Sequence, residues 1–224
     1  MPKRTWSYSA LGKFEKCPQS WSYQKINRLP DPSSPAMKRG NKIHARLEHA
    51  VRTGEVPDIQ TFKLARYIKD LRKRAPHVEE MWVFDKNWRF LGVGGNNKWY
   101  DDAWLYAKLD VYLPPTQKMP PRVIDWKTGR IYPEHESQAH LYALAALSRE
   151  QRDFPVVEVD MVYADRKEVH HMEIKTKDAV DQREEWTARA NVLMTATEFP
   201  RKPGKHCDWC SFSQRKGGPC DERP

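Results

Sequence analysis

The sequence predicts an α/β fold in which helices flank a central mixed β-sheet. Apolar residues recur at helical spacing over about 36–53 and 58–74. The apolar period then shortens to two residues over several short segments, which is typical of strands. These strand segments are 79–84, 88–93, 103–113 and 122–126. A chain of 224 residues can bury one good core but not two large ones, so we expect a single domain over 1–224.

The N-terminal third should be helical. Residues 7–25 form a helical pattern that begins at a serine and is interrupted at Cys17-Pro18, and 29–35 is a linker by composition. The helix at about 36–53 should end at Gly54, and a second helix should run over about 58–74.

The C-terminal half alternates helices and strands. We expect a hairpin-type turn in GVGGNN at 92–97 and a helix at about 135–149. Strands at 156–163 and 168–175 and a long helix at 177–197 should follow. The tail from 198 has no periodicity, so something other than regular structure must order it.

Charge gathers at the two ends of the chain. The net charge is +9, of which residues 1–46 contribute +8 and residues 201–224 contribute +3. A basic surface made by both ends would suit phosphate backbones, although lysine-rich ends can also simply aid solubility. A charged fraction of 31% and a mean hydropathy of -0.87 exclude an integral membrane protein. With no apolar signal segment at the N-terminus, we expect a cytoplasmic protein.

Two neighbouring strands carry the side chains most suited to catalysis. In 103–113 the odd-numbered residues are apolar, which would leave Asp110 on a polar face with Trp104, Tyr106 and Tyr112. In the next strand, the two-residue period puts Asp125 and Lys127 on one side of the sheet. Two carboxylates can hold Mg²⁺ or Mn²⁺ for phosphodiester hydrolysis, and the lysine can orient water or neutralise developing charge. Taken alone, this D-x-K pattern is more often a solvated strand edge or a surface ion pair.

Three further residues could complete such a site. His44 could be a third ligand, because imidazole suits Mn²⁺, although a lone histidine on a helix is more often a packed or capping residue. Gln138 and Tyr142 lie four residues apart on one helix face, a spacing that ordinary surface polarity also produces.

The four cysteines form a second group. They are Cys17, Cys207, Cys210 and Cys220. In a cytoplasmic protein they are more often thiolate ligands than disulfides, and the C-x2-C pair at 207–210 is a strong metal-binding signal. Four unrelated buried thiols are the alternative. A metal clasp made by 1–35 and 198–224 would order the tail.

Together these pieces resemble the RecB-type branch of the PD-(D/E)XK nucleases. The matching segments are Tyr8-Ser-Ala-Leu11 through Cys17-Pro18 and Trp21, Gly40-x-x-x-His44, Leu109-Asp110, Ile124-Asp125-Trp126-Lys127-Thr128-Gly129, Gln138-x-x-x-Tyr142, and the terminal cysteines. The resemblance implies a restriction-endonuclease-like core over 36–197. It also implies that His44, Asp110, Asp125 and the main-chain carbonyl of Trp126 are metal ligands and that Lys127 is catalytic.

The same resemblance assigns roles to the remaining residues. Gln138 and Tyr142 would support the site or touch DNA, and Glu80 could be a further acidic contributor. The one-plus-three cysteine pattern is similar to the [4Fe-4S] clasp of iron–sulfur members, with zinc as the alternative.

We therefore expect a Mg²⁺- or Mn²⁺-dependent DNA exonuclease. Exposed aromatics such as Trp104, Tyr106 and Trp209 should track the strand. No Walker-type motif occurs in the sequence, so unwinding would fall to a partner helicase, and recombination or CRISPR-adaptation partners are equally open. A non-catalytic DNA-binding adaptor and a restriction-type endonuclease remain the alternatives.

Overall fold

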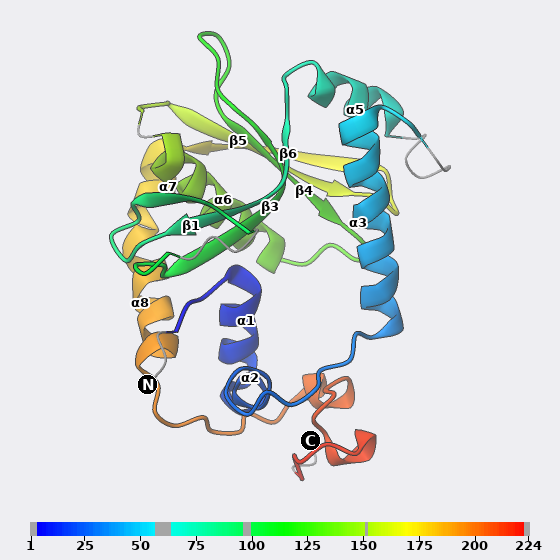
Figure 1. Ribbon diagram of the computed structural model, residues 1–224, viewed down its shortest axis with the longest axis vertical. Helices are drawn as coiled ribbons and strands as arrows, with labels where there is room; N and C mark the ends of the chain where they lie inside the picture. The colour runs from blue at the N-terminus through cyan, green and yellow to red at the C-terminus, as the bar shows by residue number, and fades with distance from the viewer. Residues whose placement is uncertain (1–3, 57–63, 96–99, 151, 222–224) are drawn as a thin grey trace.

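The computed structural model describes residues 4–56, 64–95, 100–150 and 152–221 and has a twisted sheet between two helical layers (Figure 1). The strands are β1 His77–Phe84, β2 Phe90–Gly94, β3 Leu105–Leu113, β4 Arg122–Lys127, β5 Val156–Tyr163 and β6 Glu168–Lys175. Their order is β2-β1-β3-β4-β5-β6. Among these described strands, only β4 and β5 pair in parallel, across the crossover helix α6 Glu134–Glu150. The predicted mixed sheet is confirmed.

The two faces of the sheet are covered by different helices. The larger core lies against α1 Tyr8–Lys16, α2 Pro18–Lys25, α6 and α8 Arg183–Thr195. A smaller core lies on the other face, against α3 Pro35–Thr53 and α5 Ala65–Arg72. The central strand β4 serves both, because Val123 packs in the larger core while Ile124 and Trp126 pack in the smaller one. This alternation directs Asp125 and Lys127 towards α6.

Local signals set where the N-terminal helices begin and end. The Ser7 hydroxyl accepts a hydrogen bond from the Ala10 backbone N–H and caps α1. Pro18 begins α2, where its missing N–H costs nothing. Ser34 caps α3, and Gly54 ends it with a φ of 87°, a conformation that glycine adopts without strain.

Some predicted boundaries differ from the structure. The predicted helix at 177–197 is two helices, α7 Thr176–Asp181 and α8, because the chain turns at Gln182, whose amide reaches His140 on α6. The helix predicted at 58–74 is observed over Ala65–Arg72, and residues 57–63 lie outside the described residues. Strand β2 extends to Gly94, into the predicted turn, whose residues 96–97 are also outside the described part.

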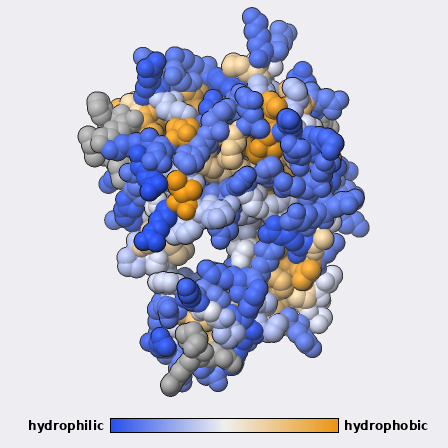
Figure 2. Space-filling model, turned by 180° about the vertical axis from the view of Figure 1, so that it is seen from behind, coloured by the Kyte–Doolittle hydropathy of each residue, from blue (hydrophilic) through white to orange (hydrophobic). Residues whose placement is uncertain are grey.

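The two ends of the chain meet at α2. The indole of Trp21 stacks on Phe199 with ring centroids 5.7 Å apart. Arg189 on α8 donates to both carboxylate oxygens of Glu15 at 2.8 and 2.9 Å. The C-terminal tail, which holds the short 3-10 turns η1 Lys205–Asp208 and η2 Gln214–Lys216, then runs beside α2 (Figure 1). From behind, a recess separates the lobe at this end from a largely hydrophilic body (Figure 2).

Within the described residues, none of the helices combines the length and apolar character needed to cross a bilayer.

Candidate active site

Three side chains from three elements converge beside the sheet. They are His44 on α3, Glu79 on β1 and Asp110 on β3, and their ligand atoms all lie within 4.8 Å of one another. His44 Nδ1 is 3.3 Å from Asp110 Oδ1. Imidazole and carboxylate oxygens are donors suited to Mn²⁺ and Mg²⁺, so this group has the chemistry of a divalent-cation site.

An irregularity in the sheet turns two of these carboxylates towards each other. Val78 pairs with Val111 and Glu80 with Leu109, but the intervening residue Glu79 has a φ of 58°. A positive φ in a glutamate is strained backbone, of a kind found at functional sites. Both strands change face at this point.

The change of face corrects the predicted alternation of 103–113. Leu105, Ala107 and Leu109 pack in the larger core, whereas Val111 and Leu113 pack in the smaller one. Asp110 lies at the change, is only 8% exposed, and points to the polar group of His44 and Glu79. Trp104 is also buried, against Trp6 and Trp88, and cannot track a DNA strand from there.

Asp125, Lys127, Gln138 and Tyr142 form a closed ring of polar contacts. Lys127 Nζ lies 2.6 Å from Asp125 Oδ2 and donates to Gln138 Oε1, also at 2.6 Å. Gln138 Nε2 donates to the Tyr142 hydroxyl at 2.7 Å. That hydroxyl lies 3.1 Å from Asp125 Oδ1 and 3.0 Å from the Lys108 carbonyl oxygen, so its one proton is shared between two acceptors. Strand spacing and the i, i+4 helix spacing together place this set.

The two carboxylate groups are joined through the backbone of β4. The Trp126 N–H donates to Asp110 Oδ2 at 2.7 Å, while the Trp126 indole is buried in the smaller core. Trp126 is therefore anchored by its buried side chain, and its backbone N–H fixes Asp110.

The electrostatics of this site depend on burial and on two carboxylates sharing one space. Burial raises the pKa of Asp110, and the charge of Asp125 raises it further, against the hydrogen bond from His44. For His44, burial lowers the pKa, but the hydrogen bond and charge of Asp110 outweigh it and raise the pKa overall. Burial likewise holds the pKa of Tyr142 well above its usual value, so this residue stays a neutral donor.

One buried oxygen of the site is paired with a lysine ammonium. Asp125 is 5% exposed, and its Oδ2 has no hydrogen-bond donor among the described residues. Lys127 Nζ is close to it but outside hydrogen-bond geometry, so the contact is an ion pair only. The Lys127 ammonium therefore balances the charge of this oxygen. The fit of a divalent cation rests instead on the donor set of His44, Glu79 and Asp110, whose imidazole and carboxylate atoms lie together.

Glu79 is the site residue that the sequence did not single out. Its neighbour Glu80 accepts hydrogen bonds from His77, Trp82 and Arg149, each at 2.7 Å, and takes no part in the cluster. Glu79 contacts Lys108 Nζ at 2.6 Å and lies with His44 and Asp110. Simple strand alternation offers no signal for this, because the unusual φ decides which glutamate turns inward.

Close packing brings α3 to the D-x-K strand. A side chain at Gly40 would place its Cβ 3.2 Å from the Thr128 hydroxyl. The glycine therefore lets α3 approach the end of β4, one turn before His44.

The cysteines lie where the two chain ends meet. Each of Cys17, Cys207, Cys210 and Cys220 is free and half-buried. Cys210 Sγ is 3.8 Å from the Ser20 hydroxyl of α2, and Cys17 and Cys210 line one cavity of about 590 Å³. No three of these sulfurs fall within 4.8 Å of one another in the described part of the chain.

Comparisons with known proteins identify the family. The sequence matches the family model of the PD-(D/E)XK nuclease superfamily over residues 5–215. This chain belongs to the PD-(D/E)XK nuclease superfamily.

Solved structures share the fold. The crystal structure of SSO0001 matches with a TM-score of 0.50 and 14% identity, over 95% of this chain and 85% of that one. A "Putative exonuclease" from Eubacterium rectale matches with a TM-score of 0.53 and 13% identity, over 99% of this chain and 91% of that one. The search of curated proteins finds no match.

Proposed function

We propose that this nuclease is a DNA exonuclease that depends on Mg²⁺ or Mn²⁺. The observation that carries the proposal is the meeting of the His44, Glu79 and Asp110 cluster with the Asp125–Lys127 pair through Trp126. His44, Asp110, Asp125 and the main-chain carbonyl of Trp126 would hold the cation. When bound, the cation would supply charge to polarise the phosphate and to acidify a water molecule.

The remaining side chains of the site would act on the water and the phosphate. Lys127 Nζ is anchored by Gln138 Oε1 and keeps donor capacity for an attacking water or a phosphate oxygen. Gln138 and Tyr142 are positioning residues: Gln138 fixes the ammonium, and Tyr142 fixes both Gln138 and Asp125. The ring thus fixes the distance between Lys127, which would orient the water, and Asp125, which would hold the cation, before the substrate binds.

Two observations support DNA and attack from an end. The chain carries a net charge of +9, concentrated in its end segments, which favours a phosphate backbone. The Eubacterium rectale structure, described as a "Putative exonuclease", supports an end-directed activity. Because the sequence has no Walker-type motif, a helicase or a recombination or CRISPR-adaptation partner would deliver the strand.

We also propose that the four cysteines hold a [4Fe-4S] cluster in preference to zinc. All four thiols are free, and the segments that carry them pack around α2. The one-plus-three arrangement of the cysteines along the chain favours the iron–sulfur cluster, because zinc sites more often pair two C-x2-C units. Such a cluster would fasten the C-terminal tail to the N-terminal helices.

The test is cleavage of end-labelled and of covalently closed circular DNA by anaerobically purified protein, with Mg²⁺, Mn²⁺ or EDTA. We expect metal-dependent loss of the linear substrates and survival of the circle. Cleavage of the circle would show that the protein is an endonuclease. Binding without any cleavage would show that it is a non-catalytic adaptor.

A further inference from the structure

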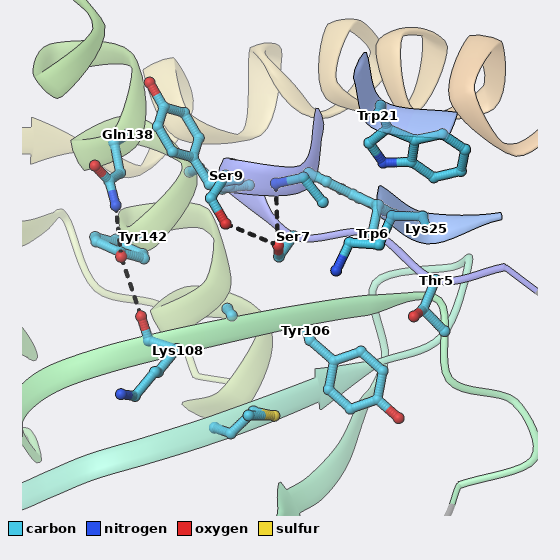
Figure 3. Close-up of a pocket in the computed structure, with 15 residues that line it drawn as sticks. Thr5, Trp6, Ser7, Ser9, Trp21, Lys25, Tyr106, Lys108, Gln138 and Tyr142 are labelled. Carbon is cyan, nitrogen blue, oxygen red and sulfur yellow. Dashed lines mark hydrogen bonds between the residues drawn. The ribbon is translucent and has the colours of Figure 1, made fainter. Parts of the chain in front are cut away.

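A cavity of about 530 Å³ opens beside the catalytic side chains and has no role in the proposed chemistry so far. It lies between the first turn of α1, strands β1 and β3, and α6 (Figure 3). Gln138 and Tyr142 belong both to its wall and to the polar ring described above, and the wall also includes Lys108, whose carbonyl accepts from Tyr142. A ligand in the cavity would therefore be separated from Lys127 by the Gln138 side chain.

The wall of the cavity combines aromatic surface with cations and hydroxyls. Tyr106 is half-exposed on β3 and lines the cavity, with its ring on the side of β3 away from Ser7 (Figure 3). Lys25 is exposed at the end of α2 and enters from the other side. Aromatic rings beside cations are the combination that binds single-stranded nucleic acid, because every base has a face to stack and every phosphate a charge.

Three hydrogen-bonding features add to this wall. Trp6 and Trp21 line the cavity, and their buried indole N–H groups have no acceptor among the described residues. The Trp21 nitrogen lies on the side of its ring that faces Ser7 (Figure 3). The first turn of α1 contains no acidic residue, so its positive end is uncompensated.

We propose that this cavity binds one unpaired nucleotide of the strand being cut, next to the phosphodiester that is hydrolysed. The base stacks on Tyr106, and its phosphate lies towards Lys25 and the Ser7-capped end of α1. The volume suits a ligand of that size. The inference rests on the proposed nuclease function and narrows its substrate, because a base can enter only after leaving its duplex stack.

The binding test uses fluorescence anisotropy with a labelled single-stranded oligonucleotide in EDTA, so that nothing is cut. Tyr106→Ala should raise the Kd about tenfold, and Tyr106→Phe should keep the wild-type value because the ring remains. Lys25→Gln should raise the Kd and flatten its dependence on salt. The matched controls are Tyr132→Ala, at an exposed tyrosine beside a different cavity, and Lys69→Gln on α5. Both should bind like the wild type.

An abasic residue moved along the oligonucleotide identifies the ligand as a base. The wild type should lose affinity at one position near the cut end, and Tyr106→Ala should be indifferent there. Comparing the same oligonucleotide with and without its 5′-phosphate shows whether the bound phosphate is terminal or internal. A loss of affinity without the 5′-phosphate assigns the subsite to the strand terminus.

The inference is overturned if Tyr106→Ala binds as the wild type does, if no abasic position matters, or if blunt duplex competes as well as the single strand. Failure of the nuclease proposal looks different. In that case Tyr106→Ala still weakens binding, but no DNA is cut with either metal.

Discussion

Removal of the Tyr142 hydroxyl tests the polar ring most directly. Tyr142→Phe keeps the buried ring and deletes one oxygen, so it creates no sizeable cavity. The variant loses the acceptor of Gln138 Nε2 and a donor shared by Asp125 Oδ1 and the Lys108 carbonyl. Two net hydrogen bonds at about 1 kcal/mol each, with Asp125 left short of donors, amount to about 2–3 kcal/mol of unfolding free energy.

The measurement is thermal and urea unfolding in EDTA, followed by cleavage with Mn²⁺. For a chain of this length the melting temperature should fall by roughly 5–10 °C. The cleavage rate should fall by about tenfold or more, because Gln138 no longer fixes Lys127. Tyr112→Phe is the matched control: that hydroxyl is also in the larger core but donates to Glu150 at 2.5 Å, away from the site. It should lose stability and keep its cleavage rate. If Tyr142→Phe and the wild type have the same free energy of unfolding, the hydrogen bonds of the polar ring do not stabilise the protein and the reasoning is wrong.

Further predictions concern the metal, an ion pair and the cysteines. Mn²⁺ should raise the melting temperature of the wild type above its value in EDTA, and Asp110→Asn should abolish that increase, as a calorimetric titration can check. Glu80→Gln should lower the unfolding free energy by about 1 kcal/mol at pH 7 with cleavage intact. Burial raises the pKa of Glu80, but hydrogen bonds led by Trp82 and Arg149 outweigh it and lower the pKa overall. Its contribution is therefore present above the unfolded-state pKa of about 4.3 and is lost as pH falls through the lower folded value, so wild type and variant should converge in acid urea titrations. Cys207→Ser should expose the tail to limited proteolysis and bleach any iron–sulfur absorbance; an unchanged digestion pattern would contradict the clasp.

The sequence predicted those features that local chemistry decides. Ser7, Pro18 and Gly54 mark helix ends through capping and φ preferences that act within one turn. The strand period predicted that Asp125 and Lys127 share a side, and the observed 2.6 Å contact between them agrees. The helix spacing predicted that Gln138 and Tyr142 share one helix face, and the hydrogen bond between them agrees with that.

Features that depend on tertiary packing were beyond such reasoning. Trp104 was expected to be exposed, but Trp6 covers it. Strand alternation cannot predict this, because it does not indicate what packs on each face. Glu79 turns into the site through a positive φ that its residue type does not announce. The spacing of cysteines along the chain likewise does not fix the distances between their sulfurs, which the packing of the tail on α2 decides.

The change of face in β1 and β3 links the two helical layers through a single carboxylate. Asp110 stands at the point where β3 leaves the larger core and enters the smaller one, between Leu109 in the first and Val111 in the second. Coupled substitutions of this kind are non-additive when they share a partner. Substitutions at Leu109 and Val111, which flank Asp110 and pack in different cores, should therefore change the free energy of unfolding non-additively, because both displace the same carboxylate.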